Sequence, residues 1–150
     1  MREFNTYTGT YKGVEITVTS TGIGAPSAAI AMEEMYESGM QVAVRMGTVM
    51  SMQDDMLGHF MIPIAAMRRE GTSQTYVDLS YPAVAEIELV NVMNETVQQM
   101  GKRYLNGLNC TMDGFYSCMH DSKFSLECGR DMSKTFEEVK KLGVTGIDME

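Results

Sequence analysis

Apolar and polar residues alternate along two short segments near the start of the chain. Residues 4–11 and residues 14–19 are rich in Thr, Tyr, Val and Ile, and Lys12-Gly13 stands between them. Period-two alternation on both sides of a short turn is typical of a β-hairpin. We therefore expect a hairpin with alternating faces over residues 4–19.

A helix is predicted next, over residues 27–38. Gly22 and Gly24 permit a tight turn after the hairpin, Pro26 suits the first helical turn, and Gly39 ends the pattern. A dinucleotide-binding loop needs a third glycine that this stretch lacks, so we assign its glycines to the strand-to-helix turn.

The apolar run at residues 42–46 predicts a buried strand in a sheet covered on both faces. This strand carries Arg45 near its end, followed directly by Gly47 and Thr48. Ligands bind at the carboxyl ends of strands in open α/β sheets, and an Arg fork, an accessible backbone and a hydroxyl suit an oxyanion such as phosphate. The alternative is that Arg45 forms an ion pair with a surface carboxylate.

The rest of the pattern predicts three further strands and two helices. Pro63 limits its strand to the edge of a sheet or marks a bulge. A polar loop over residues 68–73 contains two arginines, for which a solvated turn with a Glu partner is the commoner explanation. The predicted strands cover residues 58–67, 104–112 and 144–150, and the predicted helices cover residues 82–101 and 131–143.

Composition limits the classes of function. A chain of 150 residues and 16.7 kDa is long enough for one domain with a real core. Its net charge of −8 argues against nucleic-acid and anionic-membrane partners. Three cysteines without a CxxC pair favour neither a disulfide framework nor a metal site, and a reducing cytoplasm is the expected setting. The 16 methionines are expected mainly to fill the core.

Four segments follow one another along the chain: Ser20-Thr21-Gly22-Ile23-Gly24-Ala25-Pro26-Ser27, Arg45-Met46-Gly47-Thr48, Phe115-Tyr116 and Asp148-Met149-Glu150. In this order they resemble the nucleoside phosphorylase superfamily, and the uridine phosphorylases within it most closely. Two further stretches, residues 69–73 and 81–84, add to the likeness, which covers nearly all of the chain. The resemblance implies an α/β fold, a three-layer arrangement with a mixed central sheet flanked by helices.

The resemblance also implies a reaction, in which phosphate displaces the base of a ribonucleoside and ribose 1-phosphate forms. No cofactor is implied, because phosphate is the co-substrate. Arg45 and Glu150 match the family's catalytic positions, with Arg45, Gly47 and Thr48 on phosphate. Thr48, Met149 and Glu150 match the ribose-binding positions.

The same resemblance implies that Phe115 and Met119 contact the base, with Phe115 stacking on it. In the uridine enzymes a Gln and an Arg read the uracil edge, and here Met119 and Asp121 stand at those positions. Met50 replaces a family glycine beside the phosphate site. These departures leave the accepted base open.

The likeness implies one partial phosphorylase-like domain over residues 1–150. It corresponds to the central part of the family chain, without the N-terminal phosphate loop and the C-terminal strand and helices. Two alternatives remain beside the phosphorylase: a non-catalytic relative that binds nucleoside weakly or assembles with complete subunits, and a nucleosidase that uses water. Homo-oligomers built from dimers are implied as well.

Overall fold

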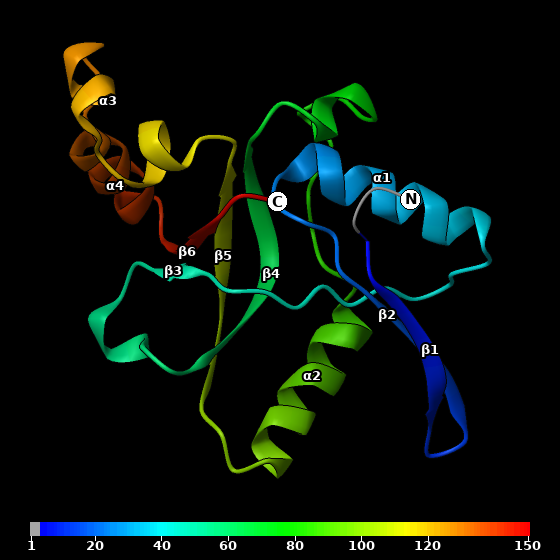
Figure 1. The fold of residues 1–150 in the computed structure, drawn as a ribbon. Helices are drawn as coiled ribbons and strands as arrows, with labels where there is room; N and C mark the ends of the chain where they lie inside the picture. The colour runs from blue at the N-terminus through cyan, green and yellow to red at the C-terminus, as the bar shows by residue number, and fades with distance from the viewer. Residues whose placement is uncertain (1–3) are drawn as a thin grey trace.

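The computed structural model describes residues 4–150, and its centre is a four-stranded mixed sheet (Figure 1). The strand order is β3-β6-β5-β4, in which β4, β5 and β6 are parallel and β3 is antiparallel to β6. The carboxyl ends of β5 and β6 therefore meet at one edge of the sheet. The strands are β3 (Met50–Ser51), β4 (Phe60–Arg69), β5 (Tyr104–Met112) and β6 (Val144–Asp148).

The predicted hairpin is confirmed as a separate two-stranded sheet. Strands β1 (Thr6–Tyr11) and β2 (Val14–Thr19) pair antiparallel around Lys12-Gly13, where both residues have positive φ. Two pairs of threonine hydroxyls bridge the strands, with Oγ1–Oγ1 distances of 2.8 Å for Thr6 and Thr19 and 2.9 Å for Thr8 and Thr17. The alternation holds, but both faces of the hairpin are largely exposed.

Helices flank the sheet, which confirms the expected mixed α/β class. In Figure 1, α3 and α4 lie to the left of the sheet, and α1 and α2 lie to its right. Of the described residues, no helix is both long enough and apolar enough to cross a bilayer. The helices are α1 (Ala25–Glu37), α2 (Ile87–Gln99), α3 (Lys123–Glu127) and α4 (Met132–Lys141), and single turns of other helix types occur at Asp54–Met56, Ser73–Thr75 and Phe115–Met119.

Pro63 lies in an edge strand and beside a β-bulge, as predicted. Strand β4 is at the edge of the sheet, and its register against β5 shifts between Pro63 and Ala65. Pro63 has no N–H to donate to the ladder, so an edge position and a bulge both accommodate it. The strand continues to Arg69, two residues beyond the predicted end.

The prediction of a buried strand at residues 42–46 is wrong. Residues 40–49 have no regular secondary structure, and Val42, Val44 and Met46 are 64%, 52% and 80% exposed. Within the described chain, ladder pairing with β6 starts only at Met50. An apolar run becomes a strand only where a neighbouring strand offers backbone partners. Here the pairing with β6 begins at Met50, after the apolar run has ended.

The helix predicted from Pro82 begins five residues later. Ala66 N donates to Ala83 O at 2.8 Å, and Ala85 N donates to Ile64 O at 3.0 Å, so residues 83–85 run beside β4. Backbone pairing with the sheet edge therefore prevents an earlier helical start. Helix α2 then buries Val90 and Val97 against Ile62 of β4.

The two arginines predicted in a polar loop end strand β4 instead. Arg68 donates through Nη2 to the carbonyl oxygens of Asp78 at 3.0 Å, Leu79 at 2.7 Å and Tyr81 at 2.5 Å. Arg69 pairs with Glu138 of α4, with Nη2 2.6 Å from Oε1. Both arginines thus join distant segments, whereas the expected partner Glu70 caps its own turn.

Methionine contributes to the core, as predicted. Cys110, Met112, Met119, Val139, Val144 and Ile147 form the larger buried cluster, and four further methionines pack against it: Met50, Met52, Met67 and Met149. This cluster joins the carboxyl halves of β5 and β6 to α4. It supports the sheet edge at which the candidate site lies.

Candidate functional site

Arg45 reaches the carboxyl end of β6 and bridges two carboxylates there. Its Nη1 lies 3.1 Å from Oδ2 of Asp148, and its Nη2 contacts Oε2 of Glu150. The side chains of Asp148 and Glu150 are only 11% and 13% exposed, while that of Arg45 is 42% exposed. Segments separated by more than 100 positions in sequence therefore form one charged cluster at the sheet edge.

Thr111 of the neighbouring strand β5 contacts the residues of this cluster. It is the penultimate residue of β5, is 5% exposed, and stands opposite Asp148 in the parallel ladder. Its hydroxyl contacts Oδ1 of Asp148 and the carbonyl oxygen of Glu150. The hydroxyl has one hydrogen to donate, and the charged carboxylate is the stronger acceptor of the two.

Gly47 and Thr48 follow Arg45 on the same irregular segment. A Cβ at position 47 would lie 3.0 Å from Nη2 and 3.3 Å from Cζ of Arg45, which is closer than side chains normally approach. Glycine therefore lets the guanidinium fold back over its own backbone. Thr48 is exposed, so its hydroxyl is open to a ligand.

Met149 stands between Asp148 and Glu150 in the sequence, directly after the last residue of β6. It is partly buried and packs against the buried cluster that contains Cys110 and Ile147. Its position beside the sugar stays a prediction.

The charges around Arg45 agree with parts of both interpretations of this residue, the oxyanion site and the ion pair. The guanidinium is paired with carboxylates, as the ion-pair alternative expected, but these carboxylates belong to the Asp148-Met149-Glu150 segment and not to an unrelated surface. Arginine has five N–H donors in a planar fork, and two of its nitrogens serve Asp148 and Glu150. A half-exposed guanidinium keeps further donors for an anion.

Phe115 belongs to a second group, which follows β5. The turn Phe115–Met119 is π-helical, and a Cβ at Gly114 before it would displace the Ser117 hydroxyl from its present position. Phe115 is 45% exposed and lies 5.0 Å from Tyr116 and 5.9 Å from His120 between ring centroids. An exposed aromatic face is available there.

Met119 and Asp121 both make contacts within the fold. They stand at the positions for which the resemblance implies contact with the edge of the base. Met119 is 7% exposed and belongs to the buried cluster. Asp121 Oδ1 accepts a hydrogen bond from Met132 N, the first residue of α4, at 3.2 Å. Neither side chain is brought next to Arg45 by the contacts of the structure.

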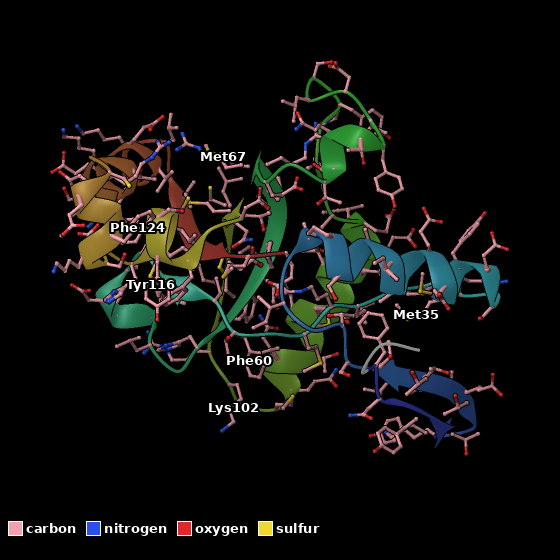
Figure 2. The ribbon with its side chains drawn as sticks, turned by 45° about the horizontal axis from the view of Figure 1, so that its top comes forward. Met35, Phe60, Met67, Lys102, Tyr116 and Phe124 are labelled. Carbon is pink, nitrogen blue, oxygen red and sulfur yellow. The ribbon has the colours of Figure 1, made fainter. Side chains whose placement is uncertain are left out.

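The Phe115 segment also borders two surface cavities. One, of about 290 Å³, is lined by Tyr116, Phe124 and Arg130 among others. Tyr116 and Phe124 are labelled in Figure 2. The other, of about 310 Å³, lies against Arg69, Met112 and Lys134. Met112 points away from the side of β5 that carries Thr111, so the second cavity is separate from the Arg45 cluster.

Sequence reasoning missed two members of the site. Thr111 and Asp148 had no assigned role, although Asp148 is within a quoted segment. Two polar residues at equivalent ends of adjacent parallel strands could have been a signal, because the ladder brings Thr111 opposite Asp148. His120, near Phe115, was also not singled out.

No metal centre is found in the described part of the chain, where no group of three or more His, Cys, Asp or Glu residues has a suitable arrangement. In Figures 1 and 2, the segment after β6 also lies beside the start of α1. The glycine turn before α1 is thus near the same edge.

Comparison with known proteins gives a consistent result. The family model described as the phosphorylase superfamily matches residues 1–150. The uridine phosphorylase of Thermococcus kodakarensis is 46% identical over 116 residues, which cover 77% of this chain and 42% of the relative. That of Escherichia coli K12 is 31% identical over 151 residues, 99% of this chain and 60% of the relative.

A relative with a different base in its name also matches. The guanosine phosphorylase of Halorubrum lacusprofundi is 34% identical over 117 residues, which cover 77% of this chain and 48% of that protein. In these three comparisons, the matched region spans about 40–60% of the relatives' length.

Proposed function

Since the chain belongs to the phosphorylase superfamily, we propose that its site serves a nucleoside phosphorylase reaction of the uridine phosphorylase type. Phosphate takes ribose from a pyrimidine nucleoside, and free base and ribose 1-phosphate are released. The observation that carries this proposal is the pairing of Arg45 with Glu150 at the carboxyl end of β6. A cation for phosphate and a carboxylate for ribose hydroxyls lie side by side, so phosphate bound to the one would be next to ribose bound to the other.

Each group has a defined task in this reaction. The sugar becomes cationic as the base departs, so the protein must hold an anionic nucleophile close to the anomeric carbon. Arg45, the Gly47 backbone and Thr48 bind the phosphate, and Glu150 accepts hydrogen bonds from ribose hydroxyls. Phosphate is the co-substrate, and the proposal includes no other cofactor.

The base is assigned to the aromatic segment. Phe115 offers an exposed face for stacking. Met119 anchors the same segment in the core, and Met149, packed against the buried cluster, supports the ribose end of the site. Met119 is buried in the core and Asp121 accepts a hydrogen bond from the start of α4, so the selection between uracil and another base is weak. The similarity to a guanosine phosphorylase agrees with this.

A second candidate function is a non-catalytic relative that binds nucleoside. Two observations favour it. Asp148 and Glu150 already neutralise Arg45, and Asp121 is committed to the N-terminus of α4. In this version the chain binds nucleoside weakly or assembles with complete subunits.

The proposal also covers the setting of the protein. We place it in the cytoplasm, since Cys110, Cys118 and Cys128 are all free thiols. We propose homo-oligomers built from dimers, with nucleoside and phosphate as the small-molecule partners.

The experiment is a base-release assay on the purified chain with uridine, with and without inorganic phosphate. The phosphorylase predicts base release only with phosphate, and ribose 1-phosphate as the second product. Phosphate-independent release would indicate a nucleosidase. Binding of uridine without release would support a non-catalytic relative that binds nucleoside. Neither binding nor release would reject the phosphorylase, the nucleosidase and the nucleoside-binding relative, and would leave only assembly with complete subunits.

A further inference from the structure

We propose that Asp148, held by Thr111, is the positioning residue for Arg45. Glu150 is the partner that leaves the guanidinium when ligands bind, and phosphate then takes its place. This proposal rests on the proposed function, because it concerns how phosphate and nucleoside share the same cluster. It gives the two carboxylates of Arg45 different tasks. It also makes the binding of one ligand depend on the other.

Asp148 is fixed from two directions. Its backbone belongs to β6 and is paired with Thr111 of β5 in the parallel ladder. Its carboxylate then has separate partners on its two oxygens, the Thr111 hydroxyl on Oδ1 and Arg45 Nη1 on Oδ2 at 3.1 Å. A buried hydroxyl that donates to a carboxylate fixes its rotamer, so the second oxygen faces the arginine.

Glu150 lies outside that ladder. It follows the last residue of β6 by two positions, and the Thr111 hydroxyl contacts its backbone carbonyl and not its carboxylate. The carboxylate contacts Arg45 through Oε2. A glutamate with three χ angles beyond a strand end can turn toward another partner at low cost, whereas Asp148 cannot.

Charge then couples the two ligands. A phosphate dianion that approaches Arg45 meets two carboxylates, and the Glu150 carboxylate occupies the Nη2 side of the fork. Ribose hydroxyls that hydrogen-bond to Glu150 draw it away from Nη2 and leave this nitrogen for phosphate. Each ligand therefore favours the binding of the other, with a coupling in the usual range of about 5–150-fold.

The test measures phosphate affinity by titration calorimetry, with and without a C-nucleoside. Its carbon–carbon glycosidic bond is not displaced by phosphate, so both ligands stay intact. For the unaltered chain we expect at least a fivefold lower phosphate Kd when the C-nucleoside is present. Equal Kd values would overturn the coupling.

Three variants separate the roles. Thr111→Val removes the hydroxyl but keeps the shape and the β propensity, and we expect about tenfold weaker phosphate binding with little change for the C-nucleoside. Thr111→Ser retains the hydroxyl and should restore phosphate binding. Glu150→Gln should bind phosphate more tightly than the unaltered chain when no nucleoside is present, and should lose the coupling. Unchanged phosphate binding in Thr111→Val, or full coupling in Glu150→Gln, would refute the proposal.

If the chain bound neither phosphate nor the C-nucleoside, this result would count against the proposed function alone. A crystal structure of Glu150→Gln would then still test the positioning role. The positioning role predicts that Arg45 remains on Asp148 in the variant, with the Thr111 contact intact. An Arg45 side chain that has left Asp148 would contradict it.

Discussion

Arg45 and Asp148 lie 103 positions apart in the sequence, and the arginine Nη1 is 3.1 Å from the aspartate Oδ2. This contact connects an irregular, exposed segment to the carboxyl end of a buried strand. It also orients a cation beside Glu150, the carboxylate proposed to bind ribose.

Arg45→Lys should weaken phosphate binding about tenfold or more, because an ammonium on a flexible chain replaces a planar fork that serves several acceptors. Phosphate titration followed by NMR or calorimetry measures the effect. Arg103→Lys, the same change at an exposed position, is the matched control and should leave the affinity unchanged. Equal losses in both variants would mean that general charge, and not the Arg45 geometry, attracts phosphate.

Phe115→Ala should raise the Kd for uridine by roughly five- to a hundredfold, since stacking on an aromatic ring contributes about 1–3 kcal/mol per base. Fluorescence-free methods such as saturation-transfer NMR suit a chain without Trp. Phe124→Ala removes a ring that is 75% exposed on α3 and provides the control. If Phe124→Ala weakened uridine binding more than Phe115→Ala did, the base would be assigned to the neighbouring cavity instead.

Glu70 makes a pH-dependent contribution to stability. Burial raises the pKa of its carboxyl, but hydrogen bonds from the Ser73 side chain and from the Ser73 and Thr72 amides outweigh burial and lower the pKa below its usual value. A lowered folded-state pKa means that the stabilisation is complete above the unfolded-state pKa. It is lost as the pH falls through the folded-state pKa.

Glu70→Gln should therefore cost about 1–2 kcal/mol of unfolding free energy at pH 7, and the difference from the unaltered chain should shrink in acid. Urea unfolding at a series of pH values measures it. Glu37→Gln, at an exposed position on α1, should show a much smaller cost. A Glu70→Gln difference that is constant with pH would show that the ionised carboxylate is not what matters.

The three thiols should react at very different rates. Burial raises the pKa of Cys110 to about 11, and its side chain is fully buried, whereas Cys128 is exposed and Cys118 is intermediate. Because thiolate is the reactive form, an aromatic disulfide reagent at pH 8 should modify Cys128 first and Cys110 only on unfolding. Cys128→Ser should remove the fastest phase. Rapid reaction of Cys110 in the folded chain would contradict the packing of the buried cluster.

The sequence predicts most elements, and its errors have physical causes. The strand at residues 104–112 matches β5 residue for residue, because β6 and β4 supply ladder partners on both of its edges. Residues 42–46 are apolar except for Arg45, but they have no ladder partner among the described residues. Local pattern cannot tell these two cases apart, since partners come from distant segments.

The candidate site shows the same limit. Arg45 and Glu150 could be selected from motifs, but Thr111 and Asp148 act through a strand register that only the assembled sheet defines. Met149 and Met119 could be selected from motifs too, but Met119 is a member of the buried cluster and Met149 packs against that cluster. Residue type indicates the chemistry, whereas the fold decides which side chains meet.

The most direct test of the proposed site is a crystal structure of the chain with ribose 1-phosphate, which carries both groups in one molecule. The account predicts the phosphate on the Arg45 guanidinium and Thr48, and the ribose hydroxyls on the Glu150 carboxylate, with Asp148 still on Arg45. Ribose 1-phosphate bound elsewhere, with the Arg45–Glu150 pair undisturbed, would contradict it.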